Sequence, residues 1–411
     1  MIVRAVSDRS VIQGLPERPA AAAPAGSSQC DALFVLSALG VGGSERKVTR
    51  IASSLAGDST RVALCALGPP YTLASSLHRE IPVSLLDRRR RLSWQTLRAL
   101  RDVMKTHRPR TVIAVDLFAL LYVSMARRLA GLRAARVVAL VNTTSFVRLR
   151  DRAFMAGYAP LLRRCDLIVF GSLRQREQWL RRYRLHGAPS CVIHNGIDPQ
   201  RFGAGAGAQR EAARQRCGIP AARVVIGNVG RLAPEKNQLA LVRAVAALAA
   251  RGLDGHLLLV GDGAMREPLR HEAARLGIAD RLTLAGEVDD VRDLLAAMDL
   301  FALPSTSVET FSNAALEAMS MSLPVVLSDI GGAREMVETG REGYIVPAGD
   351  QEALQAKLQA LCVDAAARHA MGAAARARID RDFTFARMVG AYRAIIASAA
   401  TGAGELPIAA R

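Results

Sequence analysis

Short apolar runs recur along the whole chain and alternate with amphipathic stretches of helical period. Each run is almost continuous in Val, Leu, Ile and Ala, as is typical of strands that are buried on both faces of a parallel sheet. The first series of predicted strands covers Ala32–Ser37, Arg61–Leu67, Val83–Leu86, Thr111–Val115, Val137–Val141, Leu167–Phe170 and Cys191–His194. The second series covers Val224–Val229, Leu257–Val260, Leu282–Leu284, Leu300–Leu303, Val325–Leu327 and Tyr344–Val346. Regular alternation of such strands with helices predicts an α/β protein with doubly wound parallel sheets.

Turn-forming residues separate the two series and predict two domains. Residues 194–199 read His-Asn-Gly-Ile-Asp-Pro, and the small, flexible stretch Gly203–Ala208 follows. A chain of 411 residues is long enough for two hydrophobic cores. We therefore predict a disordered N-terminal extension at 1–30, a first Rossmann-like domain at 31–200, a second at 201–380, a helix at 381–398 that packs back on the first domain, and a tail at 399–411.

The net positive charge of the chain comes from its first half. Of the 55 Lys and Arg residues, 31 lie in residues 1–200 beside 13 acidic residues, whereas residues 201–411 hold 24 of each kind. A basic half next to a neutral half predicts contact with an anionic surface, here an anionic membrane surface. A solvated basic face in an Arg-rich chain is the alternative. Aromatic residues make up only 4% of the chain, and no nucleic-acid-binding motif is visible, so we expect no nucleic-acid partner.

Cysteine usage and hydropathy indicate the compartment. The six cysteines are scattered without C-x-x-C spacing, which speaks against a metal or redox motif and favours a reducing compartment. No apolar run is long enough to span a bilayer, and the first 29 residues resemble an extension more than a signal peptide. We predict a cytoplasmic protein that is peripheral at the inner face of the plasma membrane.

A polar loop followed by a predicted helix holds two carboxylates, Glu309 and Glu317. Ser312 is a suitable N-cap, which places Glu309 on the loop and Glu317 on the second turn of the helix. The backbone N–H groups of Phe311, Ser312 and Asn313 then lie at the helix start, where an anion is favoured. Backbone amides that can bind a phosphate, together with carboxylates that can bind hydroxyl groups, outline a nucleotide-sugar site. The alternative is that both carboxylates serve only as partners of the helix dipole and bind no ligand.

Glycine-rich turns follow the first strand of each series. Gly42 and Gly43 join a strand to a helix and let the backbone approach a phosphate closely, although glycine in such a turn can equally serve packing. The corresponding turn of the second series contains Gly230, Arg231 and Lys236. Its two cations can neutralise a diphosphate, whereas a solvated turn is the alternative.

Two more turns lie at carboxyl ends of predicted strands, where open parallel sheets bind ligands. Gly261 follows one strand, and Val288 lies in the turn after the next strand. Backbone groups around Val288 could accept a nucleotide base. Asp289 and Asp290 could instead cap the following helix.

In combination these motifs resemble glycosyltransferase family 4, the retaining enzymes of GT-B fold. The matching segments are 42–45, 194–198, 230–237, 260–263, 309–319, 323–328 and 331–335. The resemblance covers about residues 31–398 and implies two Rossmann-like domains with a cleft between them. It assigns the acceptor to the first domain and the nucleotide-sugar to the second.

The resemblance also implies residue roles. Arg231 and Lys236 would hold the donor diphosphate, Glu317 the ribose hydroxyls, and Glu309 the transferred sugar. Gly42 and Gly43 would close over the phosphates from the opposite domain, while Gly230, Gly261, Val288 and the amides of residues 311–313 complete the donor site. The catalytic set implied is Glu309, Arg231 and Lys236, without a metal or cofactor.

Two positions depart from the family pattern. Thr310 replaces a glycine, and Asn142, followed by Thr143, stands where many members have a histidine. We place Asn142 and Thr143 on the sugar or acceptor side. An amide can hydrogen-bond but cannot act as a base near neutral pH, which raises the alternative of a catalytically weak GT-B scaffold.

The predicted function is a retaining, metal-independent hexosyltransferase. It moves a sugar from a nucleotide-diphosphate-sugar, with a UDP-sugar favoured, to a glycan or lipid-linked acceptor in cell-envelope polysaccharide or lipopolysaccharide synthesis. We expect a monomer or weak dimer. A GT-B scaffold and, less favoured, a nucleic-acid-binding protein that uses the basic first half are the alternatives.

Overall fold

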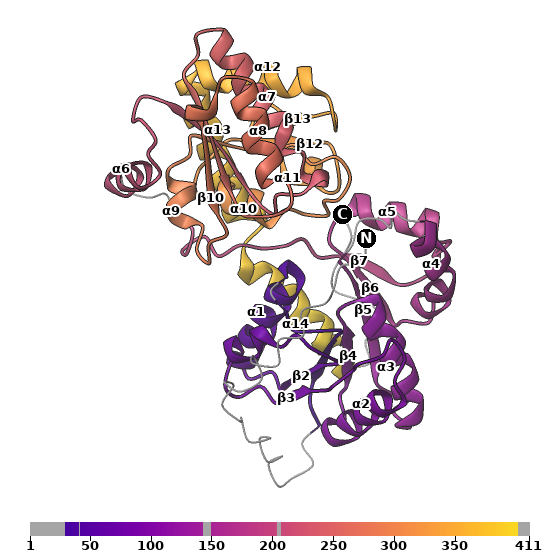
Figure 1. Cartoon of the computed structure of the whole chain (residues 1–411). Helices are drawn as coiled ribbons and strands as arrows, with labels where there is room; N and C mark the ends of the chain where they lie inside the picture. The colour runs from indigo at the N-terminus through magenta and orange to yellow at the C-terminus, as the bar shows by residue number, and fades with distance from the viewer. Residues whose placement is uncertain (1–28, 41, 143–148, 204–206, 402–411) are drawn as a thin grey trace, which may run out of the picture.

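The computed structural model describes residues 29–40, 42–142, 149–203 and 207–401 and divides them between two parallel sheets (Figure 1). The first sheet has the order β3-β2-β1-β4-β5-β6-β7 and the second the order β10-β9-β8-β11-β12-β13. Every strand pair in both sheets is parallel. The predicted fold class, an α/β protein with two doubly wound sheets, is confirmed.

The first sheet and its helices account for the chain up to the linker, which we define as residues 193–203. Its strands are β1 (Ala32–Leu36), β2 (Val62–Ala66), β3 (Val83–Leu85), β4 (Thr111–Ala114), β5 (Arg136–Val141), β6 (Leu167–Phe170) and β7 (Ser190–Val192). Its helices are α1 (Gly43–Gly57), η2 (Thr72–Ser76), α2 (Trp94–His107), α3 (Leu117–Leu129), α4 (Leu149–Leu162) and α5 (Leu173–Arg182).

The second sheet follows the linker. Its strands are β8 (Val224–Val229), β9 (Gly255–Val260), β10 (Leu282–Gly286), β11 (Leu300–Leu303), β12 (Val325–Ser328) and β13 (Gly343–Val346). Its helices are α6 (Gly207–Arg216), η3 (Pro234–Lys236), α7 (Gln238–Ala250), α8 (Arg266–Arg275), η4 (Ala279–Arg281), α9 (Arg292–Ala296), α10 (Asn313–Ser320), α11 (Ala333–Met336), α12 (Gln351–Val363) and α13 (Ala365–Asp382).

The predicted strands all correspond to observed ones because their side chains are apolar at most positions. All five residues of β1 are buried, and so are all four of β11, since helices cover both faces of each sheet. β1 pairs with β2 on one side and with β4 on the other, which makes this the point where the strand order reverses. β8 lies in the same position between β9 and β11. Ligands bind at such reversal points, outside the carboxyl ends of the strands.

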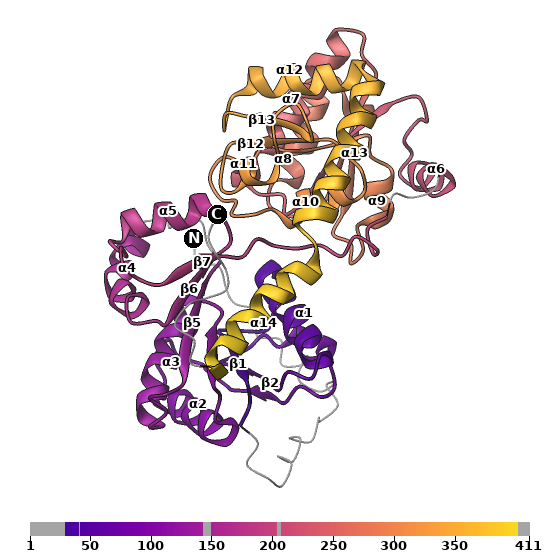
Figure 2. The ribbon, with the colours of Figure 1, turned by 180° about the vertical axis from the view of Figure 1, so that it is seen from behind.

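The last helix, α14 (Phe385–Thr401), leaves the second domain and lies along the first (Figure 2). Its residues Met388, Tyr392 and Ile395 are buried in the same apolar cluster as Phe34 of β1 and Ile51 of α1. Burying several large side chains, each worth about 1.5–3 kcal/mol, holds this crossing helix against the first sheet. The chain therefore passes between the domains twice.

The two crossings are bonded to each other. The Ile197 amide donates to the Phe383 carbonyl oxygen at 2.9 Å, and the Phe385 amide donates to the Ile197 carbonyl oxygen at 2.7 Å. A side chain at Gly196 would collide with the backbone of Thr384, so glycine is required where the two segments meet. In the part of the chain that the structure describes, no helix has the length and apolarity needed to cross a membrane.

Candidate active site

A cavity of about 420 Å³ lies between the carboxyl ends of the two sheets. The first domain and the linker contribute Gly43, Ser44, Lys47, Val141, Asn142, Gly171 and Asn195 to its walls. The second domain contributes Arg231, Lys236, Val308, Glu309, Thr310, Phe311 and Asn313. The structure thus brings the predicted catalytic set, Glu309, Arg231 and Lys236, into one cavity with Gly43, Phe311, Asn313 and Asn142.

Two helix N-termini face each other across this cavity. Gly42 caps α1, and Ser312 caps α10 by accepting a hydrogen bond from the Ala315 amide at 3.2 Å, as predicted for this serine. A Cβ atom on Gly43 would lie 4.0 Å from Asn313 Nδ2, so the two helix starts are close. Unsatisfied N–H groups at both ends, together with the helix dipoles, create a positive potential that favours an anion.

The predicted catalytic residues Lys236 and Glu309 form an ion pair. Lys236 Nζ lies 2.6 Å from Glu309 Oε2, and the two side chains are only 20% and 19% exposed. Ser305 Oγ adds a longer contact of 3.4 Å to the same carboxylate oxygen. Lys236 is the last residue of η3, and Glu309 lies on the loop after β11. The pair therefore joins two strand ends that are neighbours in the sheet.

Arg231 lies in the wall of the cavity with more freedom than Lys236. Its side chain is 73% exposed and pairs with Glu235 at 3.1 Å. A surface pair of this kind contributes about 0–1 kcal/mol, so the guanidinium can leave Glu235 for another anion at small cost.

Gly230 and Gly261 have a packing role that the sequence did not reveal. Gly230 has φ of +154° and Gly261 has φ of +131°, a region in which a side chain is strained. A Cβ atom on Gly261 would collide with the Gly230 carbonyl oxygen. These glycines do not line the cavity; they let the turns after β8 and β9 pack against each other. Val288, the predicted base contact, packs against the core of the second domain and also lies outside the cavity wall.

Glu317 lies on α10, outside the cavity wall, among basic groups of the first domain and of the linker. Burial raises the pKa of Glu317 to about 7, while the positive charges of Arg201, Arg50 and Arg46 oppose that rise. Arg50 lies over the Phe385 ring at 4.6 Å, which fixes this cation near the interdomain crossing. The carboxylate that the sequence assigned to ribose is thus close to its titration point at neutral pH.

Lys47 and Asn195 line the cavity but were not among the predicted site residues. Lys47 Nζ donates to Asn142 Oδ1 at 3.1 Å and to Asn195 Oδ1 at 3.2 Å. Asn142 Nδ2 donates to the Val115 carbonyl oxygen at 2.8 Å, so the amide predicted to meet the sugar already has two protein partners. Two signals in the sequence point to Lys47: it is one of only four lysines, and it follows Gly43 by one helical turn. Thr143 lies outside the described residues.

Glu335 ties the two domains together beside the cavity. Its carboxylate accepts hydrogen bonds from the Leu173 and Arg174 amides, at 2.8 and 3.1 Å, at the start of α5. It also lies 2.8 Å from His194 Nε2. Burial raises the pKa of Glu335, but the bonds from His194 and the two amides outweigh it and leave the pKa below its ordinary value. A carboxylate from one domain thus caps a helix of the other.

The Phe311 ring anchors the loop that carries Glu309. It stacks on the His194 ring, with centroids 4.6 Å apart, and meets the Phe383 ring edge-on at 5.3 Å. A Cβ atom on Gly332 would approach this ring to 2.6 Å, so the ring occupies the space that a larger residue would need. Aromatic pairs of this geometry add about 0.5–1.5 kcal/mol each beyond their burial.

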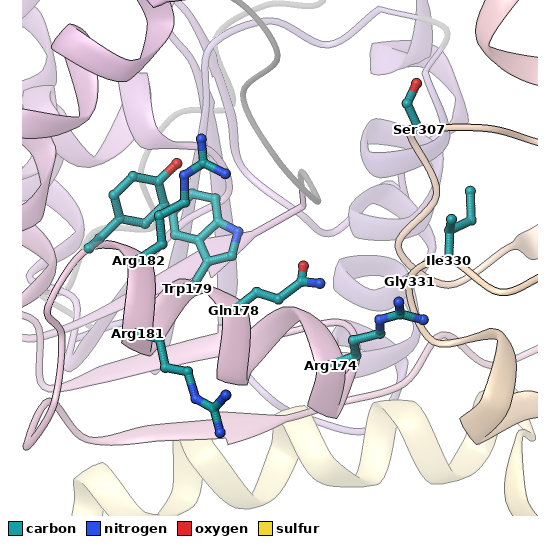
Figure 3. Close-up of a pocket in the computed structure, with 9 residues that line it drawn as sticks. Arg174, Gln178, Trp179, Arg181, Arg182, Ser307, Ile330 and Gly331 are labelled. Atoms are coloured by element: carbon teal, nitrogen blue, oxygen red, sulfur yellow. The ribbon is translucent and has the colours of Figure 1, made fainter. Parts of the chain in front are cut away.

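A second cavity, of about 640 Å³, lies between α5 and two loops of the second domain (Figure 3). α5 and its C-cap residue Tyr183 supply one wall, with Arg174, Gln178, Trp179, Arg181 and Arg182, and the loops supply Ser307, Ile330 and Gly331. We call it the α5 cavity. Figure 3 shows Arg174 and Gln178 directed from α5 toward these loops. Gly331 packs against the Glu309 and Thr310 carbonyl oxygens. A single loop therefore separates the α5 cavity from the cavity of about 420 Å³ described above, which we call the central cavity.

Arg174 is the one arginine of the α5 cavity with an ion pair to Asp329, at 2.7 Å, among the residues that the structure describes. Arg181 and Arg182 are exposed. The described residues contain no group of three or more His, Cys, Asp and Glu side chains arranged to hold a metal ion.

Two family models match the chain, one on each domain. Residues 41–201 match the model described as Glycosyltransferase Family 4, and residues 223–364 match the one described as Glycosyl transferases group 1. A D-inositol 3-phosphate glycosyltransferase of Stackebrandtia nassauensis is 33% identical over 254 residues, 58% of this chain and 56% of the relative. The lipopolysaccharide core biosynthesis mannosyltransferase LpsB of Rhizobium meliloti is 29% identical over 245 residues, 58% of this chain and 67% of the relative. The matched segment spans about half to two thirds of these relatives.

Similarity to a solved structure extends over nearly the whole chain. The crystal structure of Anabaena Alr3699/HepE in complex with UDP superposes with a TM-score of 0.79 at 23% identity, covering 89% of this chain and 99% of that one. The UDP-glucose complex of the same protein superposes with a TM-score of 0.74 at 21% identity, covering 90% and 100%. At this identity the superposition establishes a shared fold, the two-domain GT-B arrangement.

Proposed function

Since the chain belongs to glycosyltransferase family 4, we propose that it is a retaining hexosyltransferase that uses a nucleotide-diphosphate-sugar. The acceptor is a glycan or lipid-linked molecule of bacterial cell-envelope polysaccharide or lipopolysaccharide synthesis, as the name of the LpsB relative supports. A UDP-sugar is favoured as donor because the similar HepE structure holds UDP-glucose. The observation that carries the proposal is the Lys236–Glu309 ion pair in a cavity where two helix N-termini meet.

The donor diphosphate is proposed to lie between the helix starts. Lys236 and Arg231 supply positive charge, and the amides at Gly43 and at residues 311–313 supply N–H groups. When the bond from the sugar to the diphosphate breaks, negative charge builds up on the departing phosphate. Donors that are already in place stabilise this charge without reorganisation, which is the largest single effect in many enzymes.

Glu309 is proposed to accept hydrogen bonds from the sugar hydroxyls. Its second role is to hold Lys236 in the cavity through the 2.6 Å ion pair until the diphosphate arrives. In this mechanism the departing phosphate and the incoming acceptor hydroxyl share one face of the sugar. The acceptor oxygen bonds to the sugar carbon as the bond to the diphosphate breaks, and the hydroxyl proton passes to the departing phosphate, so the configuration is retained without a protein nucleophile. The protein's own cations and amides balance the charge, and metal independence is part of the proposal.

Glu317 is proposed to hold the ribose hydroxyls in its charged form. Because burial raises its pKa to about 7, we expect donor affinity to fall as the pH is lowered through 7. If only the carboxylate form binds, the dissociation constant rises roughly tenfold per pH unit below the pKa. Calorimetric titration of UDP over the pH range from about 8 to about 5.5 measures this change. The Glu317→Gln variant should bind more weakly and show little of this dependence.

The same proton gives a stability readout. In the folded protein Glu317 takes up a proton as the pH falls through 7, its pKa. In the unfolded chain the glutamate takes up this proton only near its ordinary pKa of about 4.3. Between these values the folded state carries more protons, so lowering the pH should raise the Glu317 contribution to the free energy of unfolding. Urea titrations of wild type and Glu317→Gln test this sign; an identical pH dependence in both would contradict the burial of Glu317.

The acceptor is proposed to bind on the first domain with its anionic group in the α5 cavity. Arg181 and Arg182 are available there, and Ser307 and Gly331 bring the cavity within one loop of Glu309. A basic domain can also rest on an anionic membrane surface, where each cation contributes about 1 kcal/mol.

Vesicle flotation at physiological salt tests the membrane contact. Wild type should float with phosphatidylglycerol vesicles and not with phosphatidylcholine ones, and Arg181→Gln/Arg182→Gln should float less. The matched control is Arg251→Gln/Arg270→Gln in the neutral second domain, which should behave as wild type. Equal flotation with both lipids would rule out a membrane role for the basic domain.

A thermal-shift screen with UDP-, GDP- and ADP-sugars, followed by transfer assays with the donor that binds, tests the proposed function. A ligand present at 100 times its dissociation constant stabilises the folded state by about 2.7 kcal/mol. A GT-B scaffold with weak catalysis is the second candidate, favoured by Asn142, whose oxygen is bonded to Lys47. Donor binding without hydrolysis or transfer would support the scaffold, and no binding of any donor would overturn both.

A further inference from the structure

Lys47 places a cation of the first domain in the wall of the central cavity. It lies on the second turn of α1, one turn after Gly43, which lines the same cavity. Its ammonium donates to the side-chain oxygens of Asn142 and Asn195. These partners come from the end of β5 and from the linker, so three separate segments meet at one nitrogen atom.

Both partners of Lys47 are neutral. Among the described residues no carboxylate forms an ion pair with it, in contrast to Lys236, which is paired with Glu309. Burial lowers the pKa of Lys47 to about 8. Removing an ammonium from water is costly unless an opposite charge compensates, and two amide oxygens compensate only in part. An anion in the cavity would supply the missing charge.

The two asparagines hold Lys47 in place. Asn142 Nδ2 is bonded to the Val115 carbonyl oxygen, and Asn195 Nδ2 donates to the Phe311 carbonyl oxygen at 2.8 Å. These bonds hold each amide in the orientation in which its oxygen accepts from the ammonium. Two of the three ammonium N–H groups are thereby occupied, and within the described ranges of the chain the third has no protein acceptor and can bind a ligand. The bond to Phe311 also links Lys47 to the entrance of α10, where the amides of the donor site begin.

We propose that Lys47 binds the diphosphate of the nucleotide-sugar from the first domain, opposite Arg231 and Lys236, and that Asn142 and Asn195 are its positioning residues. This inference rests on the proposed function. It gives the departing phosphate a cation on both sides of the cavity. It also explains the environment of Asn142: the amide fixes a lysine and leaves contact with the ligand to that lysine.

Nucleotide binding tests this role without requiring transfer. For Lys47→Met, we expect the dissociation constant of UDP to rise at least about tenfold, the effect of losing one charge-assisted hydrogen bond. The dissociation constant of UMP should rise much less, because the second phosphate is absent. Lys105→Met, which removes an exposed lysine of α2, is the matched control and should bind both nucleotides as wild type does.

The pH dependence supplies a second readout. Lys47 is charged below its pKa of about 8 and loses its proton above it, so UDP affinity should fall as the pH is raised from about 7 to about 9.5. This fall should be absent in Lys47→Met. In Asn142→Ala it should begin at lower pH, because the charged form of Lys47 loses one of its acceptors; a purely structural role of Asn142 would not shift it.

The outcomes separate the two proposals. If wild type binds neither UDP nor GDP, the proposed function fails. If wild type binds UDP and Lys47→Met binds it equally well, or loses UMP and UDP to the same extent, Lys47 is a structural residue and this inference is wrong. Should Lys47→Met not fold, Lys47→Arg serves instead: it keeps the charge at high pH, so its UDP affinity should no longer fall above pH 8.

Discussion

Replacement of Lys236 by methionine should lower kcat for sugar transfer by roughly 10²- to 10³-fold, the usual cost of removing one preorganised charge-stabilising group. Lys236 is proposed to face the departing diphosphate, and methionine keeps the length of the side chain while removing its charge. The variant also leaves Glu309, whose side chain is 19% exposed, without its 2.6 Å partner. A carboxylate freed in this way would repel the diphosphate, which adds to the loss.

Initial rates with the donor identified by thermal shift measure this effect, with Lys105→Met as the control variant. The circular dichroism spectrum and melting temperature of Lys236→Met should remain close to those of wild type, because the pair lies in the wall of a cavity and not in a core. A Lys236→Met variant that keeps more than half of the wild-type rate would remove Lys236 from the catalytic set.

Glu309→Gln should lower kcat/KM by roughly 10- to 100-fold, since hydrogen bonds to a charged group contribute about 1.5–3 kcal/mol. Glutamine keeps the shape of the side chain but cannot neutralise Lys236. It also offers the sugar hydroxyls a single, uncharged oxygen. The loss should appear with the complete nucleotide-sugar and be smaller in UDP binding, because UDP lacks the sugar that Glu309 contacts.

A double-mutant cycle identifies the pair as one unit. Residues in contact show coupling energies of about 0.5–3 kcal/mol, so Lys236→Met/Glu309→Gln should be less impaired than the two single effects combined. Strict additivity would mean that the 2.6 Å ion pair has no role in the reaction. Arg231→Gln paired with Glu309→Gln serves as the comparison, because Arg231 is bonded to Glu235 instead.

Much of the fold was predictable because the information is local. Apolar runs without alternation predicted strands covered on both faces, and each such run corresponds to an observed strand. The N-cap at Ser312 was predictable because a serine followed by a helix-forming stretch favours that one geometry. The placement of Arg231, Lys236 and Glu309 in one cavity followed from a topological rule, since each lies in the connection that follows a parallel strand and carboxyl ends of parallel strands share an edge.

The sequence was less informative where glycine has more than one use. Gly43 and Gly230 looked equivalent, yet Gly43 lines the cavity and Gly230 packs against Gly261. The difference depends on what lies opposite each backbone segment. That neighbour belongs to another strand end, so neither spacing nor composition could identify it.

The sequence by itself determined the two parallel sheets, the loops at their carboxyl ends and the charged residues that those loops carry, because period, capping and turn chemistry act over a few residues. Only the tertiary structure decided which of these groups became partners. Lys47 meets Asn142 and Asn195 from 95 and 148 positions away, and Glu335 caps α5 from more than 150 positions away. Tertiary packing also buries Glu317 and Lys47, and this burial moves the pKa of each group toward neutrality. Charge and desolvation depend on the whole packed surroundings of a group, which no local pattern contains.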